Sequence, residues 1–339
     1  MILGCLNQDD CFAIDICKFS IAKTENGMIK TAMILGAGFG ERLKPLTLVR
    51  PKPLLPVLNK TMLEWWAEFL VSAGMKRLVI NVHHLAPLML EHNDNLTASF
   101  KGRLEIAASP EEQILGTGGA IKRAEALLGK DDFLVADADI FTDFELVKLS
   151  LKQLANPGRL ATMGLLTGRD KANVSLGEGG RILGFRYPEP LAGEASRQTY
   201  CGVMAVSPEI FTYLPDGPSD IIETFNRAIG QGADIFGWTY DPAIWRDMGT
   251  PRDYWELNRD LAAGRTNIHS TALVEGRLSG WNVVGPKARL EEGCAIENSV
   301  IWPGVIVSPG VQVKNAVVAG DVPPGTTVDG GVFCDLPGC

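Results

Sequence analysis

Residues 31–54, TAMILGAGFGERLKPLTLVRPKPL, decide how the rest of the chain is interpreted. The apolar run at 33–35 predicts a buried strand, and the glycine-rich segment 36–40 (GAGFG) follows at its carboxyl end. Glycine has no Cβ, so the backbone N–H groups of such a loop can approach an anion closely. Arg42 and Lys52 add a planar guanidinium and an ammonium charge. This combination is typical of a site that binds a polyphosphate.

The loop differs from the two common phosphate-binding motifs. A dinucleotide fingerprint needs G-x-G-x-x-G running straight into a helix, but the third glycine position is Glu41 and Pro45 opposes a clean helix start. The Walker A pattern G-x-x-x-x-G-K-[ST] is absent. The sequence therefore disfavours a nicotinamide-dependent dehydrogenase. The alternative is a glycine turn with incidental surface charges.

Strand and helix patterns alternate from residue 31 to about residue 165. We expect strands at 31–36, 77–83, 103–108, 133–137 and 160–166. We expect helices at 61–74, 85–93, 118–128 and 144–155, the first opening with a capping box at Thr61 and Glu64. This alternation predicts an α/β fold whose mostly parallel sheet has helices on both faces. Ligands of such sheets bind beyond the carboxyl ends of the strands.

Two further clusters are expected at the same sheet edge. Residues 114–120 (ILGTGGA) lie between a predicted strand and helix, where glycines let the backbone press against a flat ligand and Thr117 adds a hydroxyl. A tight loop that only starts a helix is the alternative. Asp137 and Asp139 follow an apolar strand, and burying their charges without a partner is costly. Their spacing directs both carboxylates the same way, and such hard oxygen ligands suit Mg²⁺. A solvated strand end is the alternative for Asp137.

Composition limits the class of protein. The 339 residues exceed what one compact core usually serves, and 46% hydrophobic and 21% charged residues are ordinary for a globular protein. The net charge of −8 argues against nucleic acid as the main partner. No uninterrupted apolar stretch approaches 18 residues, so no membrane-spanning helix is expected. Seven scattered cysteines favour reduced thiols and a cytoplasmic location.

Two features are interpreted as structural. Residues 1–27 lack a signal-peptide pattern and are expected to be an N-terminal extension, because the segment starting at Met28 looks like a natural beginning. A redox or metal-binding arm is the alternative. His83 and His84 end a predicted strand, but no third ligand occurs at metal spacing, so packing is favoured over zinc.

The pattern changes after residue 265. Aliphatic residues recur every six positions, in the groups Ile268 and Val274, then Leu278, Val284, Leu290 and Ile296, then Ile301, Val307 and Val313. Glycine and proline fill the intervening turns. Hexapeptide periodicity predicts a short parallel β-helix of about three coils. We expect it to dock on the first domain or pair with another subunit.

The string L-G-A-G-x-G-E-R-L-x-P-L-T followed by P-K-P-L resembles the sugar-1-phosphate nucleotidyltransferases, and so does W-R-D-M-G-T-P at 245–251. The resemblance implies a Rossmann-like, mostly parallel mixed sheet with a C-terminal left-handed parallel β-helix. It implies four segments: an extension at 1–27, a nucleotidyltransferase domain at 28–264, a hexapeptide-repeat β-helix at 265–330 and a tail at 331–339. The expected partners are an NTP and a sugar-1-phosphate.

The resemblance also implies roles for particular residues. Arg42 and Lys52 become catalytic groups that hold the leaving pyrophosphate and the α-phosphate, and Asp139 and Asp247 become Mg²⁺ ligands. The nucleotide-binding residues expected are Leu35, Gly36, Ala37, Gly38, Gly40, Glu41, Gly116, Thr117 and Gly118. The sugar-binding residues expected are Asp137, Asn173, Arg186, Tyr200 and Gly202.

The acceptor-binding segment departs from the family pattern. Many members have Glu-Lys-Pro after Gly184 and Phe185, with the lysine on the sugar phosphate, whereas this chain has Arg186-Tyr187-Pro188. Either Arg186 takes that charge or the acceptor is held differently. The resemblance over 31–145 favours an N-acetylmuramate-1-phosphate uridylyltransferase and hence UTP, while the predicted β-helix is more like mannose-1-phosphate guanylyltransferases. A non-catalytic regulatory homologue is the alternative of another class, and His269 alone does not support a β-helix acyltransferase.

Overall fold

The computed structural model describes residues 28–169 and 172–335, so the expected extension at 1–27 lies outside the described residues. A nine-stranded mixed sheet forms the larger part, and seven of its strands run in the order β10-β9-β11-β6-β1-β4-β5. The other two strands are β8, which pairs with β11, and β12, which pairs with β8. The bounds of the nine strands are β1 Thr31–Leu35, β4 Arg77–Val82, β5 Glu105–Pro110, β6 Phe133–Asp137, β8 Ala161–Leu166, β9 Val174–Leu176, β10 Ile182–Phe185, β11 Ser196–Val206 and β12 Ile235–Thr239.

The middle of this sheet is parallel, as predicted. β1 pairs in parallel with β4 and β6, and β4 pairs in parallel with β5. β11 runs antiparallel to β6, β8 and β9, so the sheet is mixed. β9 and β10 pair antiparallel and form a hairpin around residues 177–180. Because β1, β4 and β6 are parallel neighbours, the loops at their carboxyl ends meet at one edge.

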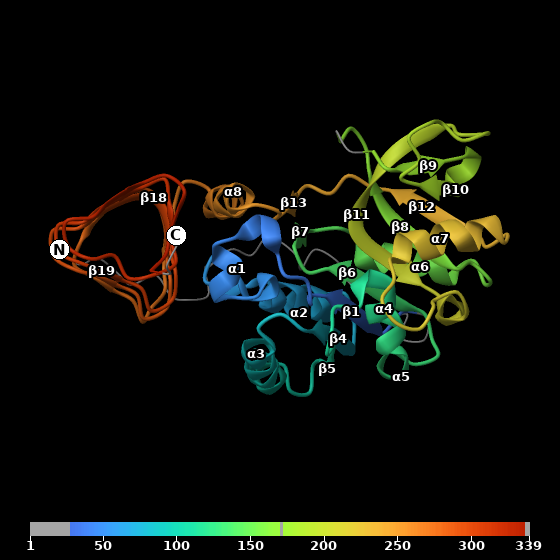
Figure 1. Ribbon diagram of the computed structural model, residues 1–339, viewed down its shortest axis with the longest axis horizontal. Coiled ribbons are helices and arrows are strands. Elements are labelled where there is room, and N and C mark those ends of the chain that lie inside the picture. The colour runs from blue at the N-terminus through green and yellow to red at the C-terminus, as the bar shows by residue number, and fades with distance from the viewer. Residues whose placement is uncertain (1–27, 170–171, 336–339) are drawn as a thin grey trace.

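Helices cover both faces of the sheet (Figure 1). The alternation along β1 shows why: Ala32 and Ile34 belong to one hydrophobic core and Met33 to the other. One face is covered by α2 Met62–Ser72, α3 Ala86–Ser99 and α6 Leu146–Leu154. The other face is covered by α4 Gly116–Arg123, α5 Glu125–Leu128 and α7 Ile221–Gly230.

Local chemistry fixes the helix ends. Thr61 and Glu64 form the predicted capping box of α2, and Thr250 and Asp253 form a second one on α8 Pro251–Ala262. The single helix expected at 118–128 is wrong in one detail, because α4 ends at Arg123 and α5 starts at Glu125. Position 41 opens only a short 3₁₀ turn, η3 Glu41–Leu43, ahead of the four-residue α1 Leu46–Val49. A further 3₁₀ turn, η4 Lys52–Leu54, then precedes the small hairpin of β2 Pro56–Val57 and β3 Lys60–Thr61.

The C-terminal part consists of short parallel strands that stack in successive layers. Figure 1 looks along this stack and shows a three-sided outline, with α8 between it and the rest of the molecule. From Val284 onward the six-residue aliphatic pattern becomes vertical stacks of buried side chains, with Leu290 paired with Val307 on one side and Ile296 paired with Val313 on another. Ile268, the first member of the pattern, is exposed. The strands are β14 Thr266–Ile268, β15 Leu273–Val274, β16 Arg277–Val284, β17 Arg289–Leu290, β18 Ala295–Ile301, β19 Ile306–Val307, β20 Gln312–Lys314, β21 Val317–Val318, β22 Thr327–Asp329 and β23 Val332–Phe333.

The described cysteines depart in part from the expectation of reduced thiols. Cys201 and Cys294 are buried free thiols, but Cys334 is disulfide-bonded. An expectation of wholly reduced cysteines is therefore wrong at Cys334, since composition shows only that the count is odd. Among the described residues no helix is both long and apolar enough to cross a membrane.

Candidate active site

The glycine loop leaves the carboxyl end of β1, which is flanked by β4 and β6. Its position is fixed by a buried hydrogen bond in which Gly36 N donates to Asn81 Oδ1 at 2.7 Å. Gly36 also lies against Pro53, since a Cβ added there would come within 2.8 Å of the proline ring. The loop is therefore pressed between β4 and the Lys52 segment, where a side chain at position 36 has no room.

A buried polar network connects this loop to the start of α4. Asn81 Nδ2 donates to Glu111 Oε1 at 2.7 Å, and Leu115 N donates to Glu111 Oε2 at 3.0 Å. Asn81 and Glu111 are buried, so the network needs all of its hydrogen bonds. Reasoning from the sequence missed both residues. The available signal was an asparagine inside the otherwise apolar strand LVINV.

The network surrounds a cavity of about 310 Å³ at the carboxyl edge of the sheet. The cavity is lined by Leu35, Gly36, Ala37, Gly38, Gly40, Lys52, Pro53, Asn81, Glu111, Ile114, Gly116, Thr117, Asp137, Ala138 and Asp139. A Cβ added at Gly38 would meet no atom within 4 Å, so Gly38 faces open space. Most of the residues expected to bind a nucleotide thus line one cavity. Glu41 and Gly118 do not line it, and the Glu41 carboxylate pairs with Lys44 at 2.6 Å.

The Gly-Thr-Gly-Gly segment packs against its own chain, which corrects part of its interpretation. A Cβ at Gly116 would lie 2.6 Å from the carbonyl oxygen of Ser219, and Gly118 N donates to that oxygen at 2.8 Å. Thr117 Oγ1 accepts a hydrogen bond from Ile221 N at 2.9 Å, at the start of α7. Because these glycines have no side chains, the 217–219 loop packs directly against their backbone. Gly116 and Thr117 also line the cavity.

The two aspartates expected to hold a metal lie at the ends of adjacent strands, with Asp139 directly before β7 Ile140–Thr142 and Asp247 at the end of β13 Trp245–Asp247. β13 pairs antiparallel with β7, and Met248 N donates to the Asp139 carbonyl at 3.0 Å. Asp247 is thereby held beside Asp139, although more than a hundred residues separate them in sequence. Asp247 Oδ1 is buried and has no hydrogen-bond partner among the described residues. A buried carboxylate oxygen without a partner needs a cation or a donor.

Lys52 meets this carboxylate group from the opposite wall. Its ammonium forms an ion pair with Asp139 Oδ2, and the two side chains are only 16% and 22% exposed. Burial raises the pKa of Asp137 to about 8, and the negative charge of Asp139 adds to this while Lys52 opposes it. Burial also raises the pKa of Asp247, again with help from Asp139 and against Lys52 and Arg42. Both shifts show that Lys52 and Arg42 do not fully offset the cost of charging these carboxyl groups, and a bound cation would lower that cost.

Arg42 lies on the Asp247 side of the site. Its guanidinium comes within 3.3 Å of a Cβ built on Gly249, and its charge opposes the burial that raises the pKa of Asp247. The side chain is exposed and has no hydrogen bond or ion pair among the described residues. Arg42 is thus available to bind an anion that enters from the cavity.

The residues expected to bind a sugar fall into two groups. Gly202, with φ of 86°, lies where an added Cβ would meet Ile140 at 2.5 Å and Asp137 Oδ2 at 3.4 Å. Tyr200 precedes it on β11, and its buried hydroxyl has no hydrogen-bond partner among the described residues. Burial raises the pKa of Tyr200 well above its ordinary value, so this hydroxyl remains protonated and can donate. These two residues and Asp137 therefore form one group beside the carboxylates.

The second group lies at the end of the β9–β10 hairpin. Asn173 and Arg186 are exposed, and Arg186 N donates to the Asn173 carbonyl at 2.8 Å. Arg186 Nη1 pairs with Asp220 Oδ2 at 2.7 Å, and the other oxygen of Asp220 caps α7. The charge of Arg186 is therefore partly neutralised, and neither residue lines the cavity described above.

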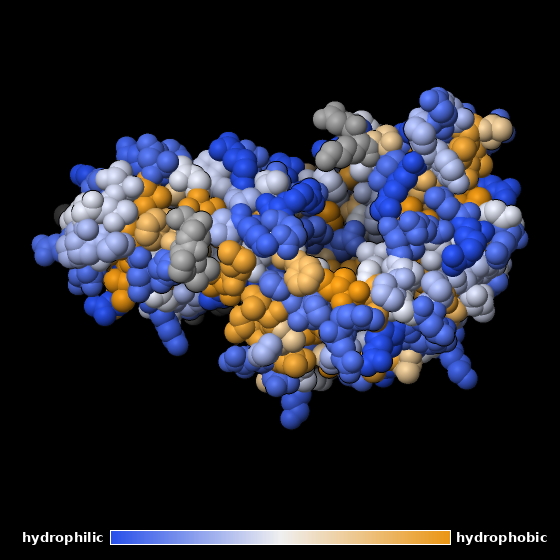
Figure 2. Space-filling model, in the orientation of Figure 1, coloured by the Kyte–Doolittle hydropathy of each residue, from blue (hydrophilic) through white to orange (hydrophobic). Residues whose placement is uncertain are grey.

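The histidine pair has a packing role, as the sequence indicated. His83 Nδ1 lies 2.9 Å from the Glu111 carbonyl, and His84 Nε2 lies 2.8 Å from the Thr47 carbonyl. Phe39 contacts both imidazoles edge-on, with ring centroids 5.7 and 5.5 Å away. Figure 2 shows hydrophobic surface over the α1 and α3 part of this face, where Leu48 and Leu88 are also exposed. These contacts leave the histidines engaged with backbone and aromatic groups.

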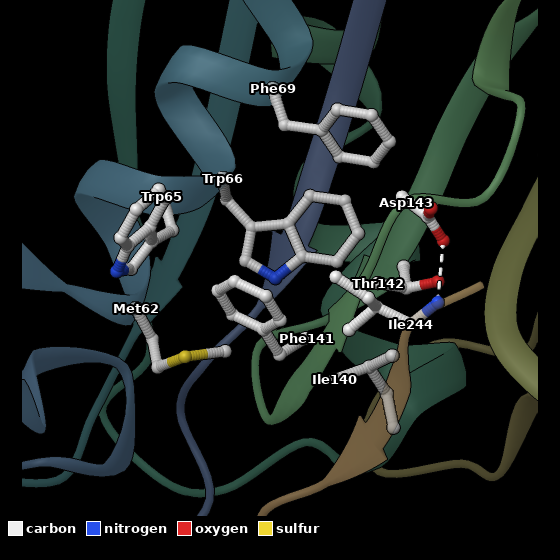
Figure 3. A pocket seen from close by; sticks show the side chains of 9 residues that line it. All are labelled: Met62, Trp65, Trp66, Phe69, Ile140, Phe141, Thr142, Asp143 and Ile244. Carbon is white, nitrogen blue, oxygen red and sulfur yellow. Dashed lines mark hydrogen bonds between the residues drawn. The ribbon is translucent and has the colours of Figure 1, made fainter. Parts of the chain in front are cut away.

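A second pocket lies between α2 and β7, and its lining is aromatic (Figure 3). It is lined by Met62, Trp65, Trp66, Phe69, Ile140, Phe141, Thr142, Asp143 and Ile244, and its volume is about 30 Å³. Asp143 Oδ1 is engaged by Ile244 N at 3.0 Å. A small apolar slot without cations cannot hold a polyphosphate, so the chemistry belongs to the glycine-loop cavity.

Comparisons with known proteins agree with this geometry. The chain is 26% identical to a UTP–glucose-1-phosphate uridylyltransferase of Synechocystis over 85% of this chain and 82% of that protein. It is 32% identical to an N-acetylmuramate alpha-1-phosphate uridylyltransferase of Caulobacter vibrioides over 66% of this chain and 93% of that protein. A mannose-1-phosphate guanylyltransferase of Mycobacterium tuberculosis is 27% identical over 84% of this chain and 82% of its own length.

Solved structures show the same fold. A UDP-glucose pyrophosphorylase in complex with UDP-glucose superposes with a TM-score of 0.58 at 22% identity, covering 70% of this chain and all of that one. The sequence model of the Nucleotidyl transferase family matches residues 31–264, which contain the glycine loop, Lys52 and all three site aspartates. The chain belongs to the nucleotidyl transferase family.

Proposed function

We propose that this protein transfers a nucleotidyl group from an NTP to a sugar-1-phosphate, forming an NDP-sugar and pyrophosphate. The observation that supports this proposal most strongly is the lining of one cavity. A glycine loop, the Lys52 ammonium and the carboxyl groups of Asp137 and Asp139 line it, and Asp247 lies beside Asp139. The reaction brings two polyanions together, so it needs backbone donors and cations on one side and a metal-binding group on the other. This site supplies both.

The carboxylates suit Mg²⁺ as the metal. Asp139 and Asp247 would hold it, and the orphaned Asp247 Oδ1 is the polar atom that a cation would satisfy. The described residues offer no group of three or more side chains placed to bind a metal, so phosphate oxygens and water would complete its shell. When bound, Mg²⁺ would neutralise charge on the reacting phosphates.

The chain's own residues position the reactants. A phosphate oxygen of the sugar-1-phosphate attacks the α-phosphorus of the NTP, the bond to the β-phosphate oxygen breaks, and pyrophosphate leaves. Lys52 stabilises negative charge that builds on the α-phosphate, and Arg42 binds the leaving pyrophosphate through paired N–H groups. The backbone of the glycine loop and of Gly116 and Thr117 borders the base. No covalent enzyme intermediate is needed.

UTP is the nucleotide we favour, with N-acetylmuramate-1-phosphate or a hexose-1-phosphate as acceptor. The uridylyltransferases of Synechocystis and Caulobacter vibrioides support this choice, while the guanylyltransferase of Mycobacterium tuberculosis supports a mannose-1-phosphate guanylyltransferase as the alternative. Tyr200, Gly202 and Asp137 would contact the sugar. Asn173 and Arg186 would do so at the outer end, with Arg186 shared between the acceptor and Asp220.

A non-catalytic regulatory homologue is the alternative of another class. Such a protein would keep the fold while losing charged groups of the site. Arg42, Lys52, Asp139 and Asp247 are all present, and Lys52 is directed at the aspartates, which supports an enzyme.

A pyrophosphate-release screen tests the proposal. Four NTPs are combined with a panel of glucose-, mannose-, N-acetylglucosamine- and N-acetylmuramate-1-phosphates, with Mg²⁺ and with EDTA as the control. We expect release with one NTP–sugar pair, most strongly with UTP, and none in EDTA. No release with any pair would overturn the enzyme and favour the regulatory homologue.

For the C-terminal strands we infer a left-handed hexapeptide-repeat β-helix that begins near residue 265 and extends past the expected end at residue 330, because β23 pairs in parallel with β21. The parallel pairing of successive layers supports it. We also propose that these coils pair two subunits into a homo-oligomer, and that the nucleotidyltransferase domain at 28–264 is the catalytic unit in the cytoplasm.

A further inference from the structure

The segment that carries Lys52 is packed against the C-terminal strands as well as against the sheet. Leu55, Val57 and Leu58 belong to the same hydrophobic core as the C-terminal side chains Trp302 and Val318. α8 lies between the two parts and contributes Tyr254 to that core (Figure 1). The wall of the active site that holds Lys52 is thus built partly by residues from the other end of the chain.

A buried relay of hydrogen bonds joins the C-terminal strands to this wall. Trp302 Nε1 donates to Tyr254 Oη at 3.0 Å, and Tyr254 Oη donates to the Pro56 carbonyl at 2.5 Å. Trp302 is 2% exposed and Tyr254 is fully buried. Because both side chains are buried, water cannot replace a lost hydrogen-bond partner unless the surrounding residues rearrange. Each hydrogen bond therefore restricts the position of the other.

The other side of Lys52 is held by the same tryptophan. The Arg50 guanidinium lies over the Trp302 ring, 5.5 Å from its centroid. Arg50 and Pro56 flank Lys52 in sequence. Arg50 contacts the Trp302 ring directly, and Pro56 is connected to the Trp302 N–H through the Tyr254 hydroxyl. Between them, η4 is a tight turn in which Leu54 N donates to the Pro51 carbonyl at 2.8 Å and Leu55 N donates to the Lys52 carbonyl at 3.2 Å.

The hairpin that follows is fastened as well. Leu58 N donates to Asn258 Oδ1 at 3.1 Å, and Asn59 Nδ2 donates to Asn267 Oδ1 at 2.6 Å and to the Val284 carbonyl at 3.1 Å. These partners lie on α8 and on the first C-terminal strands. The attachment therefore continues beyond Pro56 and does not depend on a single contact.

We infer that Trp302 and Tyr254 are positioning residues for Lys52, so that the C-terminal strands complete the active site. A turn anchored at both ends has little freedom, which keeps the Lys52 ammonium against Asp139. Displacing a catalytic group by about 1 Å can lower the rate about a hundredfold, so loss of this anchoring should lower kcat. The catalytic consequence rests on the proposed function, whereas the anchoring does not.

The test compares Trp302→Phe with Trp281→Phe in the full chain. Trp302→Phe keeps an aromatic ring beneath Arg50 but removes the N–H donor. Trp281 lies in the same core and contacts Trp255 at a centroid distance of 5.2 Å, so its substitution matches the loss of packing without touching the relay. Tyr254→Phe is a second variant, which removes the hydroxyl from both hydrogen bonds. Hydrogen exchange by mass spectrometry on residues 50–59 and steady-state kinetics are measured for each.

We expect Trp302→Phe and Tyr254→Phe to speed amide exchange in residues 50–59 about tenfold and to lower kcat about tenfold, with KM for both substrates changed less than about threefold. Trp281→Phe should show neither change, even if its melting temperature falls equally. Equal exchange in the Trp302 and Trp281 variants, or an unchanged kcat beside faster exchange, would overturn the inference. If the wild-type protein releases no pyrophosphate, the proposed function fails, and the exchange comparison alone decides the anchoring.

Discussion

Replacing Lys52 by methionine tests the centre of the site, because it removes the ammonium and keeps most of the aliphatic stem. In the free protein the ammonium pairs with Asp139, and its charge also opposes the raised pKa values of Asp137 and Asp247. A preorganised group that stabilises transition-state charge contributes about 2.7–4 kcal/mol. We therefore expect kcat to fall by a factor of about 10² to 10³. Asp139→Ala should lower kcat at least about a hundredfold, because it removes a carboxylate that would hold Mg²⁺.

The assay is continuous pyrophosphate release at saturating NTP and sugar-1-phosphate, with the NTP–sugar pair found by the screen. Lys60→Met is the matched control, since Lys60 pairs with Glu68 at 2.8 Å, and both side chains are about 40% exposed. Thermal unfolding followed by circular dichroism shows whether each variant is folded at the assay temperature. Lys52→Arg keeps the charge but alters its geometry, and should recover only part of the lost rate.

A folded Lys52→Met protein with kcat within about tenfold of wild type would refute the reasoning, because so small a loss is below what a preorganised charge contributes. A similar loss in Lys60→Met would also refute it, since the effect would then follow from the removal of any lysine. A lower melting temperature with an unchanged kcat would leave Lys52 a structural residue only.

Three further results follow from the geometry. Arg42→Gln should leave the melting temperature unchanged, because the side chain is exposed and unpaired among the described residues. It should lower kcat/KM for the NTP in pyrophosphate-release kinetics, with a loss of transition-state stabilisation of about 1.5–3 kcal/mol. Gly38→Ala should leave stability unchanged and raise KM for the NTP, because the added methyl group enters the cavity without touching protein atoms. Asn81→Leu should lower the free energy of unfolding in urea by about 2–6 kcal/mol, since Gly36 N and Glu111 each lose a buried hydrogen bond at about 1–3 kcal/mol.

The positions of individual strands, helix starts and repeats could be predicted from the sequence, because neighbouring residues determine them. An apolar strand followed by glycines predicted the β1 loop, the Thr61 and Glu64 pair predicted the start of α2, and aliphatic residues at six-residue intervals predicted the C-terminal stacks. Each of these patterns depends on neighbours within one turn or one strand. Asp137 and Asp139 could likewise be named, because charges at the end of an apolar strand are costly without a ligand, whereas Asp247 was named only through the resemblance of residues 245–251 to the family motif.

Only the tertiary structure decided which of these residues meet. Asp247 reaches Asp139 because β13 pairs with β7, and no local pattern specifies the pairing of strands a hundred residues apart. Asn81 joins Gly36 to Glu111 for the same reason, as neighbouring parallel strands bring their ends together. The glycines at 116–119 were expected to face a ligand, and the structure shows that they also pack against the 217–219 loop, because sequence shows that a side chain is absent but not what occupies its space. The pairing of strands that are distant in sequence thus brought the site residues together, while local sequence patterns determined the loops and strands that carry them.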